Sequence, residues 1–107
     1  MAIPKCVHGP AHLGAVAATL YTVPVGRLLV VRNIHVCNET AGDLTFTLSL
    51  GLDAAGTRVF AGEMVNSEST YDSFAPFTLT AGQVIQASAS VAASLTITIN
   101  GEEELVA

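Results

Sequence analysis

The clearest pattern in the chain is a strict alternation of apolar and polar residues from Leu44 to Leu50. Side chains of a β-strand point alternately to its two faces, so one face of this segment is apolar and the other carries hydroxyl groups. The apolar positions are Leu44, Phe46, Leu48 and Leu50, and the hydroxyl positions are Thr45, Thr47 and Ser49. The pattern predicts a half-buried antiparallel strand.

A longer apolar run, residues 28–36, is dense in branched side chains and is bounded by turn residues. It is too short to cross a membrane as a helix, and its composition is typical of a buried strand. We expect it to be the central strand of the fold. The apolar residues change face near Arg32 and Asn33, which predicts either a β-bulge there or burial of both faces in the first half.

Shorter segments with strand character surround these two. They are residues 15–23, 57–61, 70–79, 84–90 and 95–100. Pro76 should confine its segment to a sheet edge or split it, whereas residues 62–69 are expected to form a loop and residues 101–107 an acidic tail. About seven or eight short strands joined by glycine-bearing turns predict an all-β fold, either a single antiparallel β-sandwich or a jelly roll.

The first fourteen residues have no clear period and contain two prolines and two glycines. They predict an extended N-terminal arm (residues 1–14) ahead of a β-sandwich domain (residues 15–107). The arm either lies across its own sheet or reaches a neighbouring subunit. We favour the second, because Ile3, Val7 and Leu13 have little local core to receive them. These three are therefore candidate interface residues.

The surface is expected to be poor in charge, since charged residues make up 12% and apolar residues 50% of the chain. Low charge suggests that other copies or a partner cover part of the surface, and the alternative is a monomer coated with Thr and Ser. The net charge is −5 and only four residues are basic, so nucleic acid is not an expected partner. No segment suits a membrane helix or a cleaved signal, which predicts synthesis in the cytoplasm.

The possible metal ligands are few and poorly spaced. They are Cys6, His8, His12, His35 and Cys37. Thiolate and imidazole are the ligands of zinc, but this spacing matches no zinc module, so we predict no metal and no cofactor. Two cysteines are too few for a disulfide scaffold. A reduced pair is expected, with a bridge between Cys6 and Cys37 as the alternative.

Catalytic patterns are missing from the sequence, which contains no G-x-S-x-G motif and no glycine-rich loop before a helix. The carboxylates outside the C-terminal segment fall in predicted turns and loops, where they are normally solvated. We therefore predict a protein that is not an enzyme and has no small-molecule substrate. Tyr71, Phe74 and Phe77 are a further candidate interface, and the alternative is an aromatic platform that binds a sugar.

Several turns and strands together resemble a known group of proteins. They are LYTVP at 20–24 followed by Gly26, VVRNIHV at 30–36 followed by NET at 38–40, DAAGTR at 53–58, LTAGQVI at 79–85, SAS at 88–90 and LTITING at 95–101. Across residues 20–101 the chain resembles small β-sandwich structural proteins encoded among bacteriophage and prophage virion genes.

The resemblance implies a non-enzymatic virion structural protein, first of all a capsid decoration or cement protein that packs against the capsid or itself. The alternative is a neck, collar or tail-tip component, including a receptor-recognition module that binds carbohydrate. The implied partners are other copies of the chain and phage capsid, neck or tail proteins. The implied location is the virion, and the resemblance assigns no catalytic residues.

Overall fold

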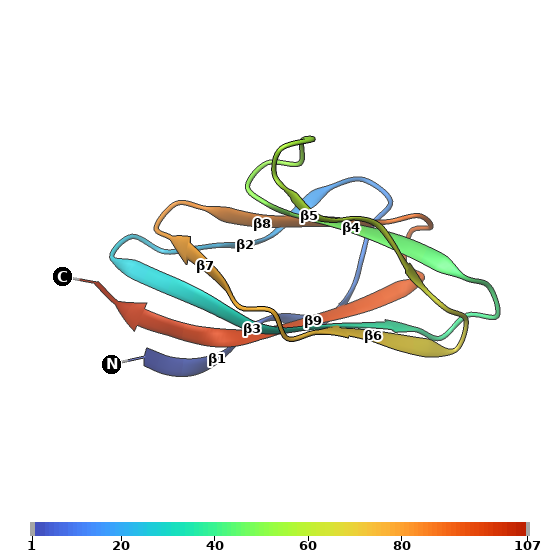
Figure 1. Cartoon of the computed structure of the whole chain (residues 1–107), viewed down its shortest axis with the longest axis horizontal. Coiled ribbons are helices and arrows are strands. Elements are labelled where there is room, and N and C mark those ends of the chain that lie inside the picture. Colours follow the sequence, from blue (N-terminus) through green and yellow to red (C-terminus); the bar gives the residue numbers. More distant parts are fainter. Residues whose placement is uncertain (1, 107) are drawn as a thin grey trace.

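The computed structural model describes residues 2–106, which form two antiparallel β-sheets packed face to face (Figure 1). The five-stranded sheet has the order β1 (Ala2–His12), β9 (Leu95–Leu105), β3 (Arg27–Asn38) and β6 (Ser69–Ser73), with β7 (Phe77–Thr80) also paired to β3. The four-stranded sheet has the order β2 (Ala18–Thr22), β8 (Val84–Ala89), β4 (Leu44–Leu50) and β5 (Arg58–Val65). The predicted all-β sandwich is confirmed.

Strand β3 is the central strand, as predicted. It pairs with β9 on one side and with β6 and β7 on the other. Its register with β9 shifts by one residue between Val31 and Asn33, so the predicted bulge lies at Arg32. The bulge keeps Val31 and Ile34 on the inner face, where both are buried, and this explains why the apolar pattern changes parity.

The core lies between the two sheets and contains the inward residues of both. Its largest fully buried side chains include Leu29, Ile34, Phe46, Leu48, Ile85, Ile97 and Ile99. Gly101 on β9 lies opposite Val31 beside the bulge. A Cβ atom there would lie 2.3 Å from the backbone oxygen of Val30, so the two strands approach this closely only because residue 101 is glycine.

The N-terminal segment, predicted as an extended arm ahead of the sandwich, is over residues 2–12 an edge strand of the sandwich's own five-stranded sheet. Strand β1 pairs with β9 at the edge of the five-stranded sheet. An edge strand tolerates Pro4 and Pro10 because one side of its backbone needs no partner. Two register shifts interrupt the pairing, and Gly9 between them has a φ of +88°. The described residues therefore form nine strands, which is more than predicted.

Two further boundaries differ from the expectation. Strand β9 continues to Leu105, so residues 101–105 are not a tail but pair with β1 and β3 on both sides. Strand β5 extends through Val65 into the predicted loop 62–69. Pro76 does split its segment, since β6 ends at Ser73 and β7 begins at Phe77. The β9 error arose because an inward position, Glu103, is filled by a carboxylate instead of an apolar side chain.

Candidate interaction surfaces

One long side of the sandwich, between β5 and the strands β6 and β7, is closed by aromatic rings. We call the four rings of Phe46, Phe60, Tyr71 and Phe77 the aromatic side. The centroid of Phe60 lies 5.6 Å from that of Phe46, 5.7 Å from Tyr71 and 6.4 Å from Phe77. These tilted and edge-to-face contacts hold Tyr71 and Phe77 against the chain's own core. Both residues, predicted as interface, are half-buried here.

Phe74 differs from these two neighbours. It lies in the connection between β6 and β7 and is 73% exposed. A sugar-binding platform presents several ring faces to the solvent, whereas Tyr71 and Phe77 pack theirs against Phe60. Phe74 is thus the member of the predicted aromatic set that offers a free ring to another molecule.

The predicted interface residues of the N-terminal segment also divide into buried and exposed ones. Val7 and Leu13 are buried in the hydrophobic core, so neither presents a surface to a neighbouring subunit. Ile3 is exposed at the start of β1, opposite Glu103 of β9. The split follows position along the segment: Val7 and Leu13 lie where the segment covers the core, whereas Ile3 lies at the N-terminal end of β1, where its side chain is exposed to the solvent.

The opposite long side, between β1 and β2, is closed by a polar group of Lys5, Tyr21 and Glu103, which we call the polar side. The ammonium of Lys5 donates hydrogen bonds to the Tyr21 hydroxyl at 2.7 Å and to the Glu103 carboxylate at 3.3 Å. The Tyr21 hydroxyl donates to the same carboxylate. The Lys5 nitrogen also lies 4.8 Å from the centre of the Tyr21 ring.

The polar side holds its charges fixed at neutral pH. The hydrogen bond from Tyr21, followed by that from Lys5, lowers the pKa of Glu103. The hydrogen bond to Tyr21 raises the pKa of Lys5, and burial raises the pKa of Tyr21. The group is therefore an ammonium, a neutral phenol and a carboxylate that stabilise one another. Sequence reasoning missed it because its members come from segments interpreted as an arm, a strand and a tail.

The predicted weak metal ligands do not come together. Residues 2–106 contain no group of three or more His, Cys, Asp or Glu side chains placed to hold a metal ion. His35 Nδ1 instead lies 2.6 Å from Asp72 Oδ1, across the pairing of β3 with β6. His12 Nδ1 lies 3.5 Å from Thr96 Oγ1, and His8 lies on the edge strand β1.

The two cysteines are free thiols on different strands. Cys6 is exposed on β1, and Cys37 is half-buried on β3. Strand β9 lies between them, where Cys6 is opposite Asn100 and Cys37 is opposite Thr96. Strands two places apart are separated by about 9–10 Å, whereas a disulfide needs Cα atoms within about 7 Å. The fold therefore excludes a bridge between the two cysteines of one chain.

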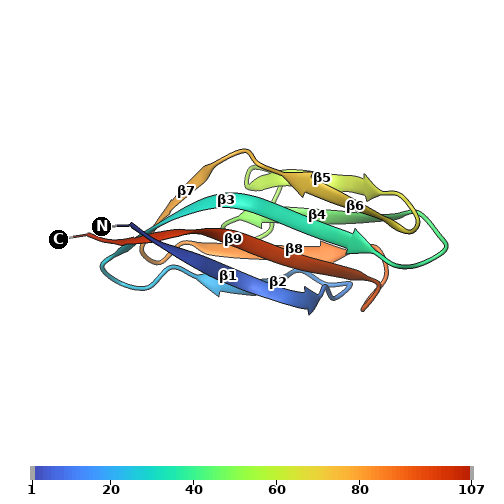
Figure 2. The same cartoon turned by 90° about the horizontal axis from the view of Figure 1, so that it is seen from below.

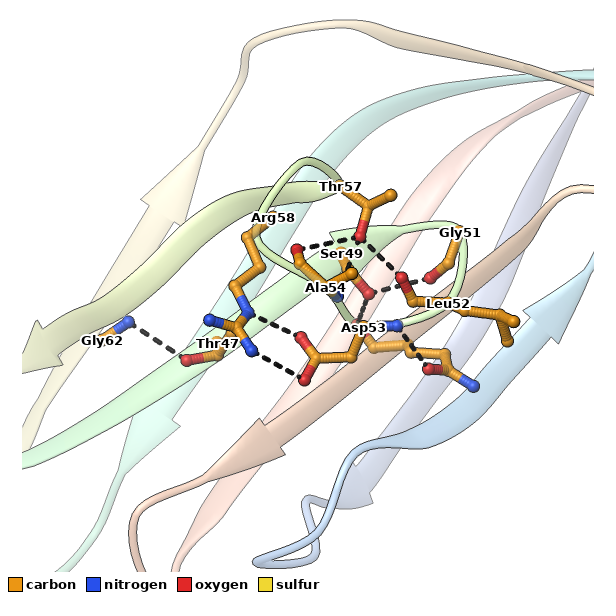
Figure 3. A network of polar contacts seen from close by, with 10 residues as sticks. Thr47, Ser49, Gly51, Leu52, Asp53, Ala54, Thr57, Arg58 and Gly62 are labelled. Carbon is orange, nitrogen blue, oxygen red and sulfur yellow. Dashed lines mark hydrogen bonds and ion pairs between the residues drawn. The ribbon is translucent and has the colours of Figure 1, made fainter.

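The loop between β4 and β5 projects from the sandwich and is ordered by its own polar contacts (Figure 3). Arg58 donates to both carboxylate oxygens of Asp53, at 2.8 and 3.1 Å, and this contact lowers the pKa of Asp53. The Thr57 hydroxyl donates to the carbonyl of Leu52 at 2.6 Å. The result is a fixed loop that holds the exposed side chain of Leu52 in the solvent.

One end of the sandwich gathers both described chain ends, and we call it the terminal end (Figures 1 and 2). It consists of the turns at 24–27 and 80–83 and the end of β9. The amide of Val106 donates to Gly26 at 2.7 Å, and that of Gly82 donates to Val23 at 2.9 Å. An open cavity of about 430 Å³ lies here, lined by Gly26, Arg27, Leu28, Thr80, Ala81 and Val106.

Two exposed apolar residues adjoin the lining residues Gly26 and Val106 in the sequence. Val25 is 95% exposed, and Leu105 is 65% exposed. This apolar patch is a candidate contact surface, because contiguous apolar patches on folded proteins are often sites of contact with other molecules. The sequence alone hides the patch, because Gly26 and Val106 are brought together only by the pairing of β3 with β9.

Charge is distributed unevenly along the molecule. The half that carries the terminal end holds three cations, Lys5, Arg27 and Arg32, and three carboxylates, those of residues 102–104, so it is balanced. Arg58 is paired with Asp53. The net charge of −5 therefore resides in the remaining carboxylates, which lie on β5, β6 and the turns of the opposite half. They are Glu39, Asp43, Glu63, Glu68 and Asp72.

No family model and no curated protein matches the chain. Within residues 2–106 there is no helix long and apolar enough to span a membrane. Solved structures do match. A chain from Bacillus endospore appendages, described as disulfide-linked pili, aligns with 16% identity and a TM-score of 0.60 over 99% of this chain and 89% of the other.

Two further structures align less closely. A chain of infectious bursal disease virus, Gt strain, has 16% identity and a TM-score of 0.40 over 96% of this chain and 28% of its own. A pentameric capsid protein from metagenomic phage sequences has 20% identity and a TM-score of 0.32, over 89% of this chain and 58% of the capsid protein. The comparisons thus establish a fold shared with the appendage protein.

Proposed function

We propose that this chain is a non-enzymatic structural protein of a phage virion, which decorates the capsid by packing against the shell and against other copies of itself. The observation that supports this most is the set of apolar side chains held in the solvent by rigid turns. Val25, Leu52 and Phe74 are 95%, 71% and 73% exposed. They lie in three separate connections between strands, so a single partner covering one of them leaves the others free for further contacts.

The physical chemistry of the surface suits assembly. Desolvating a charged group is unfavourable, so interface cores are depleted of charge and enriched in aromatic and apolar residues. Only 12% of this chain is charged, and the partly exposed outward positions of β4 and β8 include Thr45, Thr47, Gln86 and Ser88, whereas Ser49 is buried. Such faces come together without the penalty of desolvating a charge, provided that their hydroxyl and amide groups find hydrogen-bond partners in the interface.

The fold supports the same proposal. The appendage protein shows that a sandwich of this kind can serve as the subunit of a pilus, which is built from many copies. Within a virion, both a decoration protein and a neck or tail component would assemble from several copies. They differ in copy number, because decoration covers the whole shell and a neck or tail occupies one vertex.

The test is quantitative mass spectrometry of purified particles from the source, with the major capsid protein as the internal standard. We expect a copy ratio near one, or a simple fraction of it. A very low ratio would replace decoration with the neck, collar or tail. Absence of the chain from the particles would overturn the proposal, and a carried-over host protein measured in parallel sets the background.

A further inference from the structure

A single protruding side chain stands at the terminal end. Val25 occupies the middle of the turn at 24–27, in which the amide of Arg27 donates to the carbonyl of Pro24 at 3.2 Å. Gly26 in the same turn has a φ of +78°, a conformation that favours glycine. Proline and glycine thus fix the turn, and Val25 is held 95% exposed instead of folding back on the sheet.

The cavity of about 430 Å³ begins at the next residue of the same turn. Its lining comes from Gly26, Arg27 and Leu28 at the start of β3, from Thr80 and Ala81 after β7, and from Val106. Most of this lining is apolar, so water inside it is poorly hydrogen-bonded and is readily displaced by an apolar group.

A protrusion beside a cavity cannot fill it within one chain, but it can fill the same cavity of a second copy. In a two-fold arrangement the same patch serves both subunits, so residue i of one contacts residue j of the other and the reverse. We propose that the terminal end is a two-fold interface between two copies of this chain, with Val25 of each copy seated in the cavity of the other. The proposal rests on the self-association in the proposed function and names its surface.

The distribution of charge favours this occupant. The terminal half is electrically balanced, and the five carboxylates that outnumber the Lys and Arg cations belong to the other half of a molecule that is 48 Å long. Two copies joined at their terminal ends keep these carboxylates much further apart than the screening length of about 8 Å in physiological salt. Joined at the opposite ends, the copies would bring together the acidic turns that contain Glu39, Asp43 and Glu68.

The test measures the mass of the purified chain by sedimentation equilibrium over a range of concentrations. We expect a concentration-dependent dimer of the 11.0 kDa chain. Val25→Asp should raise the dimer Kd by at least about 100-fold, because it removes two apolar contacts per dimer. Val91→Asp is the matched control: it adds the same charge at an exposed turn of the opposite half and should leave the Kd within about twofold.

A second variant fills the cavity instead of removing the protrusion. Ala81→Phe places a ring among the lining residues and should also weaken the dimer, while circular dichroism and thermal melting show that both variants remain folded. Mixing Val25→Asp with Ala81→Phe is diagnostic. The mixed dimer keeps one intact contact, Val25 of one copy in the unfilled cavity of the other. It should therefore form about tenfold more tightly than either variant alone.

Three outcomes would overturn the interface. They are a chain that stays monomeric at about 1 mM, a dimer whose Kd is unchanged in both variants, and a mixture no tighter than the separate variants. Binding of an apolar dye in the cavity of a monomer would assign the cavity to a small ligand instead. Each of these leaves the particle measurement unaffected, whereas a dimer with the expected variants but no presence in particles would overturn the virion role alone.

Discussion

The two long sides of the sandwich perform the same task with opposite chemistry. On the aromatic side, Phe60 contacts the other three rings and so joins β5 to β4, β6 and β7. On the polar side, an ammonium, a phenol and a carboxylate join β1 to β2 and β9. The rings stabilise by removing apolar area from water, which requires no charge. The members of the polar group stabilise one another through hydrogen bonds and charge, because each satisfies a partner that is partly withdrawn from solvent.

The largest effect should come from the aromatic side. Phe46→Ala removes a ring that is fully buried and contacts both Phe60 and Tyr71. The loss of transfer energy and the remaining cavity should lower the free energy of unfolding by about 3–5 kcal/mol. Urea titration followed by circular dichroism measures it. Phe46→Leu, which keeps most of the apolar volume, should lose about 1 kcal/mol, and equal losses in the two variants would contradict the packing argument.

The second-largest loss of stability is expected on the polar side. Glu103→Ala removes the acceptor shared by Lys5 and Tyr21 and leaves both donors at a half-buried position. We expect a loss of about 2 kcal/mol in the same titration. Glu103→Gln is the control, because its amide oxygen still accepts from Tyr21, and it should lose about half as much. A Gln variant as unstable as the Ala variant would show that charge, not hydrogen bonding, carries the effect.

The two sides should also differ in their response to pH. Because the folded-state pKa of Glu103 is lowered, its contribution is present above the ordinary value of 4.5 and is lost as the pH falls through the folded value. The folded-state pKa of Lys5 is raised, so its contribution is present below 10.5 and is lost as the pH rises through the folded value. The stability difference between the wild type and Glu103→Gln should therefore shrink in acid.

Phe46→Leu provides the reference for this experiment. Neither the phenylalanine nor its replacement titrates, so its stability difference from the wild type should stay constant over the same acid range. A Glu103→Gln difference that is equally constant below pH 4.5 would remove the electrostatic account of the polar side.

The contrast between the sides also explains how far the sequence could be interpreted. The alternation at Leu44–Leu50 correctly predicted strand β4, and the parity change at Arg32 correctly predicted the bulge in β3. Both could be inferred because apolar residues buried on one face of a strand leave a periodic signal in the sequence. The polar side leaves no such periodic signal in the sequence. Glu103 occupies an inward position but interrupts the apolar pattern, so residues 101–105 resembled a tail although they pair on both sides.

The terminal end was hidden for a different reason. Its cavity joins residues from the connection between β2 and β3 with the start of β3, from the end of β7 with the turn after it, and from the position just beyond β9. Strand order cannot be inferred from periodicity, and without the β3–β9 pairing nothing places Val106 beside Gly26. The N-terminal segment was misjudged because prolines disfavour a central strand, while an edge strand with register shifts accepts them.

The smallest effects are expected when the same substitution, Tyr to Phe, is made on each side. Tyr21→Phe and Tyr71→Phe each remove a single hydroxyl and keep the ring. Tyr21 both donates to Glu103 and accepts from Lys5, so its loss should lower the free energy of unfolding by about 1 kcal/mol. Burial and the nearby Glu63 carboxylate raise the pKa of Tyr71. Its ring keeps the contacts with Phe46 and Phe60 after the hydroxyl is removed, and we expect a loss of about 0.5 kcal/mol or less.

Parallel urea titrations measure the free energy of unfolding of the two variants. The double variant serves as the control. The two hydroxyls lie on opposite sides of the sandwich and share no partner, so their effects should add within about 0.5 kcal/mol. A larger loss at Tyr71 than at Tyr21 would reverse the comparison. It would mean that the ring cluster depends on its hydroxyl and that the polar side is held mainly by the direct ion pair of Lys5 with Glu103.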